Sequence, residues 1–451
     1  MSFWTSARVA EAVGSRDPGG VTFTAVSTDT RSLQPGDLFV ALKGERFDAH
    51  DYLDRARQAG AAGVVVRRGA HVPAGLATFE VADTLSALGA LARARRRGLP
   101  AGTPVVAITG SSGKTSTKEM IRAALGARFR VHATSGNLNN LVGVPLTLLA
   151  ASDGVEAVVV EAGASLPGEI PKLRAVIEPT IAVVTNVGTA HLEGFGTQER
   201  LLAEKVSLLD GCPVAVTGAG AALVSAARGR AGRLVVAGRE PGAAGVDVRP
   251  DAVTLDSNGR PVVTWQGHSV TLPVFGLHQV ENAMIALGVA LAASVEPAAA
   301  LRALAGVRVP AGRGALIESG ALLVLDDTYN ANPDSMLAAF EAAGSLAAQR
   351  GRPLAVVIGS MLELGAESAR LHAAVADALL ERSPRPAVVA AVGDFVPAFE
   401  RHRAALGEHL LTAPDAAELG PRLRAALRGD EVVLVKASRG VALERVLPHL
   451  T

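Results

Sequence analysis

Short apolar runs rich in β-branched residues alternate along the chain with longer stretches of helix-like spacing. In the first half, the runs that predict buried parallel strands are Val64–Val66, Val105–Ile108, Val158–Val160 and Ile181–Val184. The stretches Lys118–Arg128 and Glu199–Leu209 have the composition and spacing of helices. This alternation is typical of an α/β protein with mostly parallel sheets.

The same pattern returns near the C-terminus. The strands predicted there are Leu354–Ile358, Ala387–Val392 and Glu431–Val435, and the helices are Ser368–Glu381 and Ala416–Arg428. Two stretches rich in helix breakers, Arg93–Pro104 and Val309–Gly314, each follow a helical segment. We therefore predict three domains, over residues 1–99, 100–312 and 313–451.

Composition narrows the class of protein. Hydrophobic residues make up 49% of the 451 residues and aromatic residues only 3%, which predicts aliphatic cores. With 44 Lys and Arg against 43 Asp and Glu, the chain lacks the basic excess of proteins that coat nucleic acid or anionic membranes. The single cysteine, Cys212, excludes an internal disulfide and a Cys-rich zinc site. Neither a secretory start nor a membrane span is evident, so we expect a cytoplasmic protein without membrane insertion.

The most informative segment is VVAITGSSGKTSTKE, residues 105–119, which runs from a predicted strand into a predicted helix. Small residues let backbone N–H groups approach phosphate oxygens, and the helix adds its positive N-terminal end. The candidate phosphate-binding residues are Gly110, Ser111, Ser112, Gly113, Lys114, Thr115 and Ser116. No Asn-Lys-x-Asp segment for guanine is present, which leaves ATPase motors, small-molecule kinases and ATP-dependent ligases.

Residues that could bind a metal follow the neighbouring strands. Glu161 ends one strand and would be a hard oxygen ligand for Mg²⁺ at the crevice where such sheets bind ligands. His191 lies just past the next strand, although a lone histidine is more often structural and imidazole is not a preferred ligand of Mg²⁺. Composition alone favours a solvated position for Lys205 on its predicted helix.

With these residues in hand, the chain resembles the Mur ligase family of peptidoglycan synthesis over essentially its whole length. The segments that carry the resemblance are 28–52, 108–120 (ITGSSGKTSTKEM), 136–149, 161–170, 185–197, 275–287, 325–336 (LDDTYNANPDSM), 358–365 (IGSMLELG) and 433–440 (VLVKASRG). The last segment departs from the family pattern at Ala437, where Gly is usual. Because Ala restricts φ, this departure bears on the role of that segment in binding the dipeptide substrate.

The resemblance implies a fold and an activity. The fold is a small N-terminal α/β domain for a uridine nucleotide, a central P-loop-type ATPase domain with a mostly parallel sheet, and a C-terminal Rossmann-like domain that closes over the site. The activity is ATP-dependent ligation of D-alanyl-D-alanine to UDP-N-acetylmuramoyl-tripeptide through an acyl phosphate, giving the UDP-linked pentapeptide, ADP and phosphate. ATP and Mg²⁺ are the implied cofactors, and other cell-wall enzymes are candidate partners.

The resemblance also implies roles for individual residues. The positions that match catalytic ones are Lys114, Lys205, His191 and Arg313. The Mg²⁺ site would comprise Thr115, Glu161, His191 and a carbamoylated Lys205. Beyond the phosphate loop, the nucleotide contacts would be Asn282, Arg313, Asp327, Tyr329, Asn330 and Asn332. Contacts with the UDP-linked substrate are predicted at Ser27, Arg31, Asp48, His50, Asn137, Asn139 and Asn140.

Other functions stay open at this point. Another Mur-type ligase or a folylpolyglutamate-synthase-like ligase would use the same chemistry, although segment 28–52 speaks against the folate enzyme. A mechanical P-loop ATPase or switch would hydrolyse ATP without an amine acceptor. A catalytically silent scaffold is the third alternative, and intact Lys114, Thr115, Glu161 and Lys205 argue against it.

Overall fold

The computed structural model describes the chain except for residues 1, 46, 189–191 and 384. The chain divides into two compact units. The first unit comprises Met1–Ala107, Arg130–Ala164 and Gly168–Thr180, and the second comprises Ile108–Phe129, Ser165–Pro167 and Ile181–Thr451. We describe each unit by itself.

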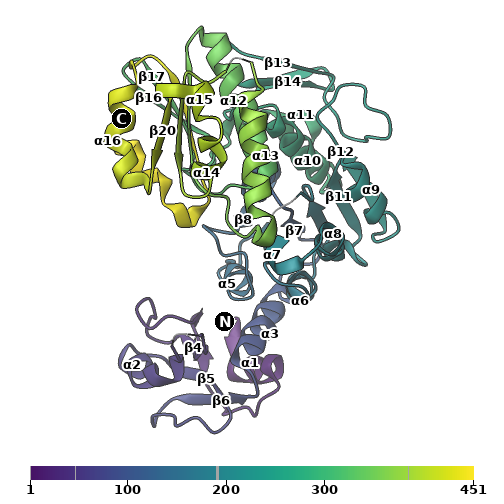
Figure 1. Ribbon diagram of the computed structural model, residues 1–451. Coiled ribbons are helices and arrows are strands. Elements are labelled where there is room, and N and C mark those ends of the chain that lie inside the picture. Colours follow the sequence, from purple (N-terminus) through teal and green to yellow (C-terminus); the bar gives the residue numbers. More distant parts are fainter. Residues whose placement is uncertain (1, 46, 189–191, 384) are drawn as a thin grey trace. The chain divides into compact units, whose positions relative to one another are not determined.

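The N-terminal part of the first unit is a parallel sheet with helices on both faces (Figure 1). Its strand order is β3-β4-β5-β6, with bounds Val26–Ser27, Leu38–Val40, Gly63–Arg67 and Ala77–Val81. The helices are α1 (Ser6–Val13), η1 (Ala49–Tyr52), α2 (Leu53–Gln58) and α3 (Thr84–Arg97), and β1 (Trp4–Thr5) pairs with β2 (Thr22–Phe23). Side chains alternate between the faces, so Val65 packs with α1 and α3 while Val64 and Val66 pack with α2.

Helix α3 is longer than the sequence predicts. The stretch from Arg93 was expected to break the helix, but α3 continues through Arg97. The guanidinium of buried Arg95 donates to the Ala151 carbonyl, and those of Arg93 and Arg97 form ion pairs with Glu178. Cations at a helix C-terminus are favourable, and these partners lie far along the sequence, so local composition could not reveal them.

One six-stranded sheet forms the central region, in the order β12-β11-β10-β7-β9-β8. The strands are β7 (Val105–Thr109), β8 (Val131–Ala133), β9 (Ala157–Glu161), β10 (Ile181–Val184), β11 (Val214–Gly218) and β12 (Arg233–Ala237). The helices are α4 (Lys114–Gly126), α5 (Gly143–Leu149), α6 (Glu169–Ile177), α7 (Leu192–Phe195), α8 (Gln198–Val206), η2 (Ser207–Leu209), α9 (Ala221–Ala227) and α10 (His278–Ala292). The boundary between the two units passes through β7.

A small antiparallel sheet follows in the second unit. It comprises β13 (Ala252–Leu255), β14 (Pro261–Trp265) and β15 (His268–Thr271). Helix α10 packs against α4, β11 and β12 and is apolar on nearly every side, as expected for a helix buried between other elements. The segments α11 (Pro297–Ala303) and η3 (Leu304–Gly306) complete this region.

The C-terminal region is a second six-stranded sheet, in the order β16-β17-β21-β18-β19-β20. Its strands are β16 (Ala315–Ser319), β17 (Leu322–Asp327), β18 (Leu354–Ile358), β19 (Val388–Val392), β20 (Leu410–Ala413) and β21 (Val432–Lys436), and only β16 pairs antiparallel. The helices are α12 (Pro333–Arg350), η4 (Gly365–Glu367), α13 (Ser368–Leu380), α14 (Phe395–Glu400), α15 (Arg403–Leu406), η5 (Gly407–His409), α16 (Ala416–Ala426), η6 (Arg439–Val441) and η7 (Leu443–His449).

Two apolar clusters cover the two faces of this C-terminal sheet. Val356 and Leu434 pack with α12, α13 and α14 on one face, whereas Val357 and Val435 pack with α16 and η7 on the other (Figure 1). Because both faces are covered, the loops at the carboxyl ends of β17, β18 and β21 are the positions left for chemistry. The cores are mainly aliphatic, as predicted, with phenylalanines concentrated beside α12–α14 and in the N-terminal sheet.

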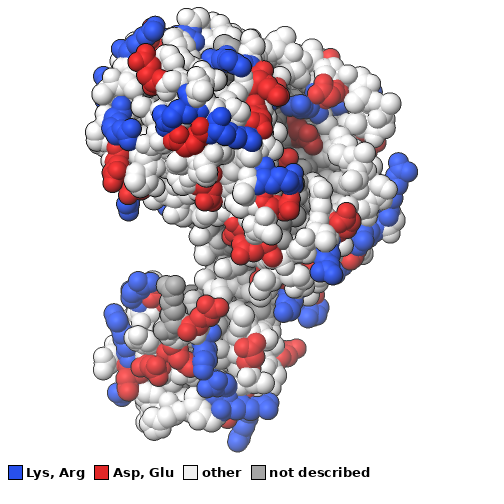
Figure 2. Space-filling view, in the orientation of Figure 1, with Lys and Arg blue, Asp and Glu red and all other residues white. Residues whose placement is uncertain are grey.

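No helix among the described residues is long and apolar enough to cross a membrane. On the face shown in Figure 2, positive and negative side chains are interspersed rather than gathered by sign. On that face, the near-neutral charge therefore does not arise from one large basic area balanced by one large acidic area.

Candidate functional site

The turn from β7 into α4 has no room for side chains at its glycines. Gly110 and Gly113 have φ values of 152° and 77°, which L residues rarely adopt. A Cβ on Gly110 would lie 1.9 Å from Thr185 Oγ1, and one on Gly113 would lie 2.9 Å from Asn282 Oδ1. Glycine is therefore required at these two positions for steric reasons, in addition to its suitability for binding phosphate.

The loop that follows β10 holds this phosphate loop in place. The Ser111 and Ser112 N–H groups donate to the Asn186 carbonyl and side-chain oxygens at 3.0 and 2.9 Å. Gly188 N–H donates to Ser111 Oγ at 3.0 Å, and Thr185 Oγ1 donates to the Ser112 carbonyl at 2.7 Å. The two loops thus form one hydrogen-bonded body at the carboxyl ends of their strands.

The cation and hydroxyl of the phosphate loop lie at the start of α4. Lys114 Nζ donates to the Gly110 carbonyl at 2.6 Å, so the side chain folds back over the loop. Thr115 is buried in the first helical turn. Asn282 of α10 lies against Gly113, and its amide donates to Gln279 Oε1 at 2.9 Å. The predicted phosphate-binding residues and Asn282, a predicted nucleotide contact, are therefore neighbours.

A second group of predicted nucleotide residues surrounds Tyr329, just after β17. The Arg313 guanidinium lies 3.7 Å from the centre of the Tyr329 ring, within the range of a cation–π contact. Tyr329 N–H donates to the Gly312 carbonyl at 2.9 Å, and Asp326 accepts from Gly312 N–H at 3.0 Å. Arg313 precedes β16 and Tyr329 follows β17, the antiparallel partner of β16. These bonds therefore bring Arg313 beside the segment that follows β17.

Asn332 connects that segment to the phosphate loop. Its Nδ2 donates to Ser112 Oγ at 2.8 Å, while its Oδ1 accepts from Ser335 N–H at 2.9 Å. The Ser335 hydroxyl accepts in turn from Asn332 N–H, which completes a capping box at the start of α12. One side chain therefore begins the helix and joins the C-terminal sheet to the nucleotide loop.

Lys436 is a neighbour of this group that the sequence did not single out. It ends β21, is almost fully buried, and its Nζ lies 2.5 Å from Asp327 Oδ2 and 2.8 Å from the Asn330 carbonyl. Burial raises the pKa of Asp327, and the Lys436 ammonium opposes that rise. The sequence did contain a signal for Lys436, because a lysine stands at the carboxyl end of an otherwise apolar strand.

Ala437, which follows Lys436, stands where the family pattern has Gly. Its backbone is not among those of the described non-glycine residues with positive φ. The methyl group is therefore accommodated without backbone strain, and the departure does not distort this loop.

His278 begins α10 near the same cluster. Its ring lies against Gly276, where a Cβ would be 2.6 Å from Cε1. Burial lowers its pKa to about 4, and the positive charges of Lys436 and Arg239 act in the same direction. The imidazole is thus neutral at physiological pH.

The candidate Mg²⁺ residues fall in different parts of the chain. In the first unit, the carboxylate of buried Glu161 accepts from Asn139 Nδ2 at 2.9 Å, and its backbone N–H donates to Thr134 Oγ1 at 2.9 Å. In the second unit, Lys205 of α8 has 0% exposure, so the solvated position that composition favoured is wrong. His191 lies outside the described residues, and the described part of the chain has no cluster of three His, Cys, Asp or Glu side chains suited to a metal.

In the first unit, the predicted substrate residues Ser27 and Arg31 meet at Asp29. The Arg31 guanidinium binds Asp29 through Nε and Nη2, at 2.9 and 2.6 Å, and the hydrogen bonds from Arg31 lower the pKa of Asp29 to about 2. Asp29 N–H lies 3.2 Å from Ser27 Oγ. The guanidinium remains exposed in one fixed direction.

Asp48 and His50 already have internal partners. His50 Nε2 accepts from Arg67 N–H at 3.0 Å, so Nδ1 carries the proton and donates to Asp48 at 2.5 Å. This network fixes the loop that precedes α2, which is a structural use of both side chains. A direct substrate contact remains a prediction.

The three predicted asparagines between β8 and α5 differ in their surroundings. Asn140 Oδ1 accepts from Val142 N–H and Gly143 N–H at the start of α5. Asn139 contacts Glu161, as described above, and its carbonyl accepts from Gly163 N–H. Asn137 is exposed. The structure therefore brings Asn139 to the carboxylate and uses Asn140 to begin a helix.

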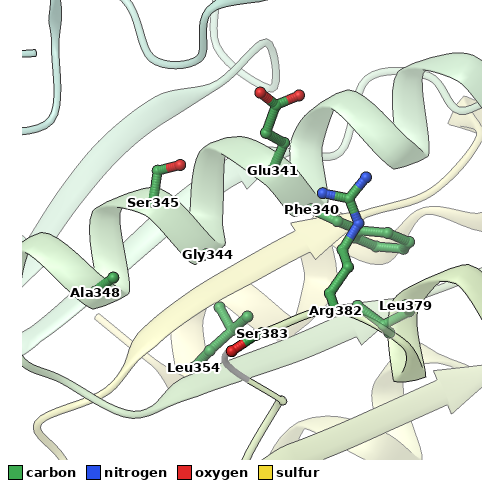
Figure 3. Close-up of a pocket in the computed structure, with 9 residues that line it drawn as sticks. All are labelled: Phe340, Glu341, Gly344, Ser345, Ala348, Leu354, Leu379, Arg382 and Ser383. Carbon is green, nitrogen blue, oxygen red and sulfur yellow. The ribbon is translucent and has the colours of Figure 1, made fainter. Parts of the chain in front are cut away.

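A surface pocket of about 240 Å³ between α12 and α13 is separate from these residues (Figure 3). Its lining includes Phe340, Glu341 and Arg382, and also Leu354, which begins β18. The candidate site residues follow the opposite, carboxyl ends of the parallel strands. None of the predicted site residues lines this pocket.

Family models match three consecutive parts of the chain. They are described as Mur ligase family, catalytic domain (residues 22–100), Mur ligase middle domain (108–290) and Mur ligase, glutamate ligase domain (312–439). The UDP-N-acetylmuramoyl-tripeptide--D-alanyl-D-alanine ligase of Escherichia coli (strain K12) is 37% identical over 443 residues, which cover 95% of this chain and 94% of the relative. The chain belongs to the Mur ligase family.

Solved structures agree with this assignment. MurF from Acinetobacter baumannii superposes with a TM-score of 0.87 at 31% identity, covering 99% of this chain and 98% of that one. MurF ligase from Thermotoga maritima in complex with ADP gives a TM-score of 0.81 at 29% identity, covering 94% of this chain and 96% of that one. These matches confirm the predicted α/β class with three Mur-ligase domains.

Gly113→Ala should weaken nucleotide binding at least about tenfold, because the new methyl group meets Asn282 and the backbone must hold a positive φ. Gly126→Ala, at the other end of α4, is the matched control, since a Cβ there has nothing within 4 Å. Calorimetric titration with an ATP analogue measures the nucleotide affinity of both variants. Equal affinity of the two variants would contradict the steric account of the loop.

Proposed function

We propose that this chain is an ATP-dependent ligase that joins D-alanyl-D-alanine to UDP-N-acetylmuramoyl-tripeptide. The products are the UDP-linked pentapeptide, ADP and phosphate. The single observation that carries the proposal is the hydrogen bond from Asn332 to Ser112, which joins the family's nucleotide loop to the segment after β17. Relatives that match over nearly their whole length are named as ligases for these substrates, which supports the choice of substrates.

The chemistry requires activation of a carboxylate. Because oxide is a very poor leaving group, the terminal carboxylate of the tripeptide first attacks the γ-phosphorus of ATP, forming an acyl phosphate and releasing ADP. The neutral amine of the dipeptide then attacks the acyl carbon. The tetrahedral intermediate collapses to the amide and releases inorganic phosphate, and the amine proton is lost to solvent or a nearby base.

The residues of the second unit fit these needs by their chemistry. Lys114 and Arg313 would reduce the repulsion between the carboxylate and the phosphates and stabilise the transferred group. Because the Ser111 and Ser112 N–H groups donate to Asn186, the backbone donors for the β- and γ-phosphates would be the N–H groups at the N-terminal end of α4. Asn282, Asp327, Tyr329 and Asn330 would contact the remainder of the nucleotide.

The donor set suits Mg²⁺. The Thr115 hydroxyl and the Glu161 carboxylate are hard oxygen ligands, and both side chains are buried, Thr115 in the first turn of α4 and Glu161 as the last residue of β9. Bound Mg²⁺ would supply positive charge to the phosphate oxygens. His191 remains a predicted member of this set.

We further propose that Lys205 is carbamoylated. An ammonium would repel Mg²⁺, whereas a carbamate offers anionic oxygen atoms. Carbamate formation needs a neutral amine, and the complete burial of Lys205 disfavours the charged form. The proposed domains over residues 1–99, 100–312 and 313–451 would bind the UDP moiety, ATP and the dipeptide, respectively, in the cytoplasm where ATP is available.

Phosphate release by the purified protein tests the proposed reaction. We expect release only when ATP, the UDP-linked tripeptide and D-alanyl-D-alanine are all present, because water is excluded from the acyl phosphate. Lys114→Ala should lower kcat by about 10²–10³, since its cation acts on the transferred phosphoryl group. Exposed Lys172 of α6 provides the control, and Lys172→Ala should keep wild-type turnover. ATP hydrolysis that ignores both acceptors would contradict the proposal.

The carbamate is tested by ¹³C NMR under labelled bicarbonate. We expect a carbamate signal in the wild type that disappears in Lys205→Ala. This variant should be nearly inactive, and a short carboxylic acid should restore part of its turnover by occupying the vacated space. Lys205→Arg should resist this rescue because its side chain fills the space with a permanent cation. An active Lys205→Ala protein, with no labelled signal in the wild type, would refute the modification.

A further inference from the structure

The loop of residues 359–364 follows the carboxyl end of β18 and leads through η4 into α13. Neighbouring loops at the same sheet edge hold it firmly. Ser438 N–H donates to the Ser360 carbonyl at 3.1 Å, and Leu362 N–H donates to Ser438 Oγ at 2.9 Å. Asp394 N–H, after β19, donates to Ser360 Oγ at 2.8 Å. The loop is therefore tied to the ends of β19 and β21.

His372 of α13 supplies the remaining anchor. Its side chain has 0% exposure, its Nδ1 lies 2.7 Å from the Ser368 carbonyl, and its Nε2 lies 2.9 Å from Met361 N. Because a carbonyl can only accept, Nδ1 carries the proton, and the bare Nε2 accepts from Met361 N–H. The ring also meets Phe395 edge-on, 4.6 Å between centres. His372 is thus neutral, held in one tautomer, and bonded to the loop backbone.

These anchors present an apolar side chain to solvent. Leu362 is 44% exposed, and its Cδ1 lies over Gly440, where a Cβ would be only 2.9 Å away. The next residue, Glu363, has a φ of 64°, a left-handed conformation that costs about 1–3 kcal/mol. Backbone strain of this kind, in a loop that its neighbours hold in place, is found at functional sites, and Leu362 is the apolar side chain that the strained loop presents.

The position of the loop indicates what it meets. The Glu363 carbonyl accepts from Glu193 N–H of α7 at 3.2 Å, and the Ser438 hydroxyl reaches the Ala331 carbonyl at 3.2 Å. Ala331 precedes Asn332, which bonds Ser112 of the phosphate loop. Leu362 therefore belongs to the same connected set of loops as the site where the carboxylate would be activated.

We propose that Leu362 contacts the methyl groups of the incoming dipeptide and that His372 is the positioning residue that holds Leu362 there. This inference rests on the proposed function. D-Alanyl-D-alanine has two methyl groups as its only apolar side chains, so a leucine in contact with them would distinguish it from glycine-containing dipeptides. Arg439 is exposed beside Gly440, with its guanidinium 5.7 Å from the centre of the Tyr329 ring, and would supply the adjacent cation for the dipeptide carboxylate.

The first test compares D-alanyl-D-alanine with D-alanyl-glycine as acceptors for wild type and Leu362→Ala. We expect the wild type to prefer the former by about tenfold in kcat/KM, the effect of one methyl group in an apolar contact. In Leu362→Ala this ratio should fall to within about twofold of unity. Because the ratio is taken within one variant, a lower fraction of active protein cancels.

The second test separates positioning from general stability. His372→Leu removes the acceptor for Met361 N–H, whereas His372→Gln can replace it with Oε1. We expect His372→Leu to raise the KM for D-alanyl-D-alanine about tenfold and to change the KM for ATP less than about twofold. His372→Gln should restore most of the dipeptide KM. The acceptor ratio should fall in His372→Leu as it does in Leu362→Ala.

Each outcome has one meaning. A wild type that ligates but whose acceptor ratio survives Leu362→Ala would overturn the proposal while leaving the ligase function intact. Equal increases in both KM values for His372→Leu, without rescue by His372→Gln, would reduce His372 to a structural residue and overturn its positioning role. A wild type that forms no amide with either dipeptide would reject the ligase function, and the inference with it.

Discussion

The turn between β7 and α4 is the constraint on which the other features of the site depend. Gly110 and Gly113 cannot carry a side chain there, because Thr185 and Asn282 occupy the space where Cβ atoms would lie. That close approach brings three separate pieces of sequence to one loop: the turn itself, the segment after β10 and the start of α10. In the proposed function, a phosphate group would meet the N–H groups at the start of α4, beside a turn whose shape these glycines allow.

The C-terminal sheet extends the same arrangement. Its parallel strands β17, β18 and β21 end at one edge, and their loops are joined by hydrogen bonds from Lys436 and Ser438. Asn332 then connects this edge to Ser112. A nucleotide in the phosphate loop and an acceptor at the edge of the C-terminal sheet would thus bind to parts of one bonded network.

The sequence predicted the repeating elements well, because buried parallel strands are continuous apolar runs and need no partner to be recognised. The ends of β9, β10 and β18 lie at or within one residue of the predictions. The phosphate loop was equally easy to predict from the sequence, since its glycines, lysine and threonine lie close together in the chain. The extension of α3 through Arg97 was missed, because Glu178 stabilises it from a distant segment.

Side-chain burial and long-range partners were the features that the sequence could not supply. Composition alone favoured a solvated position for Lys205, and only the packing of α8 makes it buried. His372 lies on an amphipathic helix with no special sequence signal. Its role depends on the hydrogen bond that it accepts from Met361 N–H, and only the fold brings these two residues together. Asp48 and His50 are the opposite case, since these two polar residues of a predicted loop are partly buried and bond each other.

The central claim is that a carboxylate is activated by phosphoryl transfer before the amine attacks. Tripeptide substrate labelled with ¹⁸O in its terminal carboxylate tests this claim most directly, with the released phosphate analysed by mass spectrometry. The acyl-phosphate route transfers the bridging oxygen, so each phosphate should carry one ¹⁸O while the new amide retains the other. Amide formation accompanied by unlabelled phosphate would contradict the account.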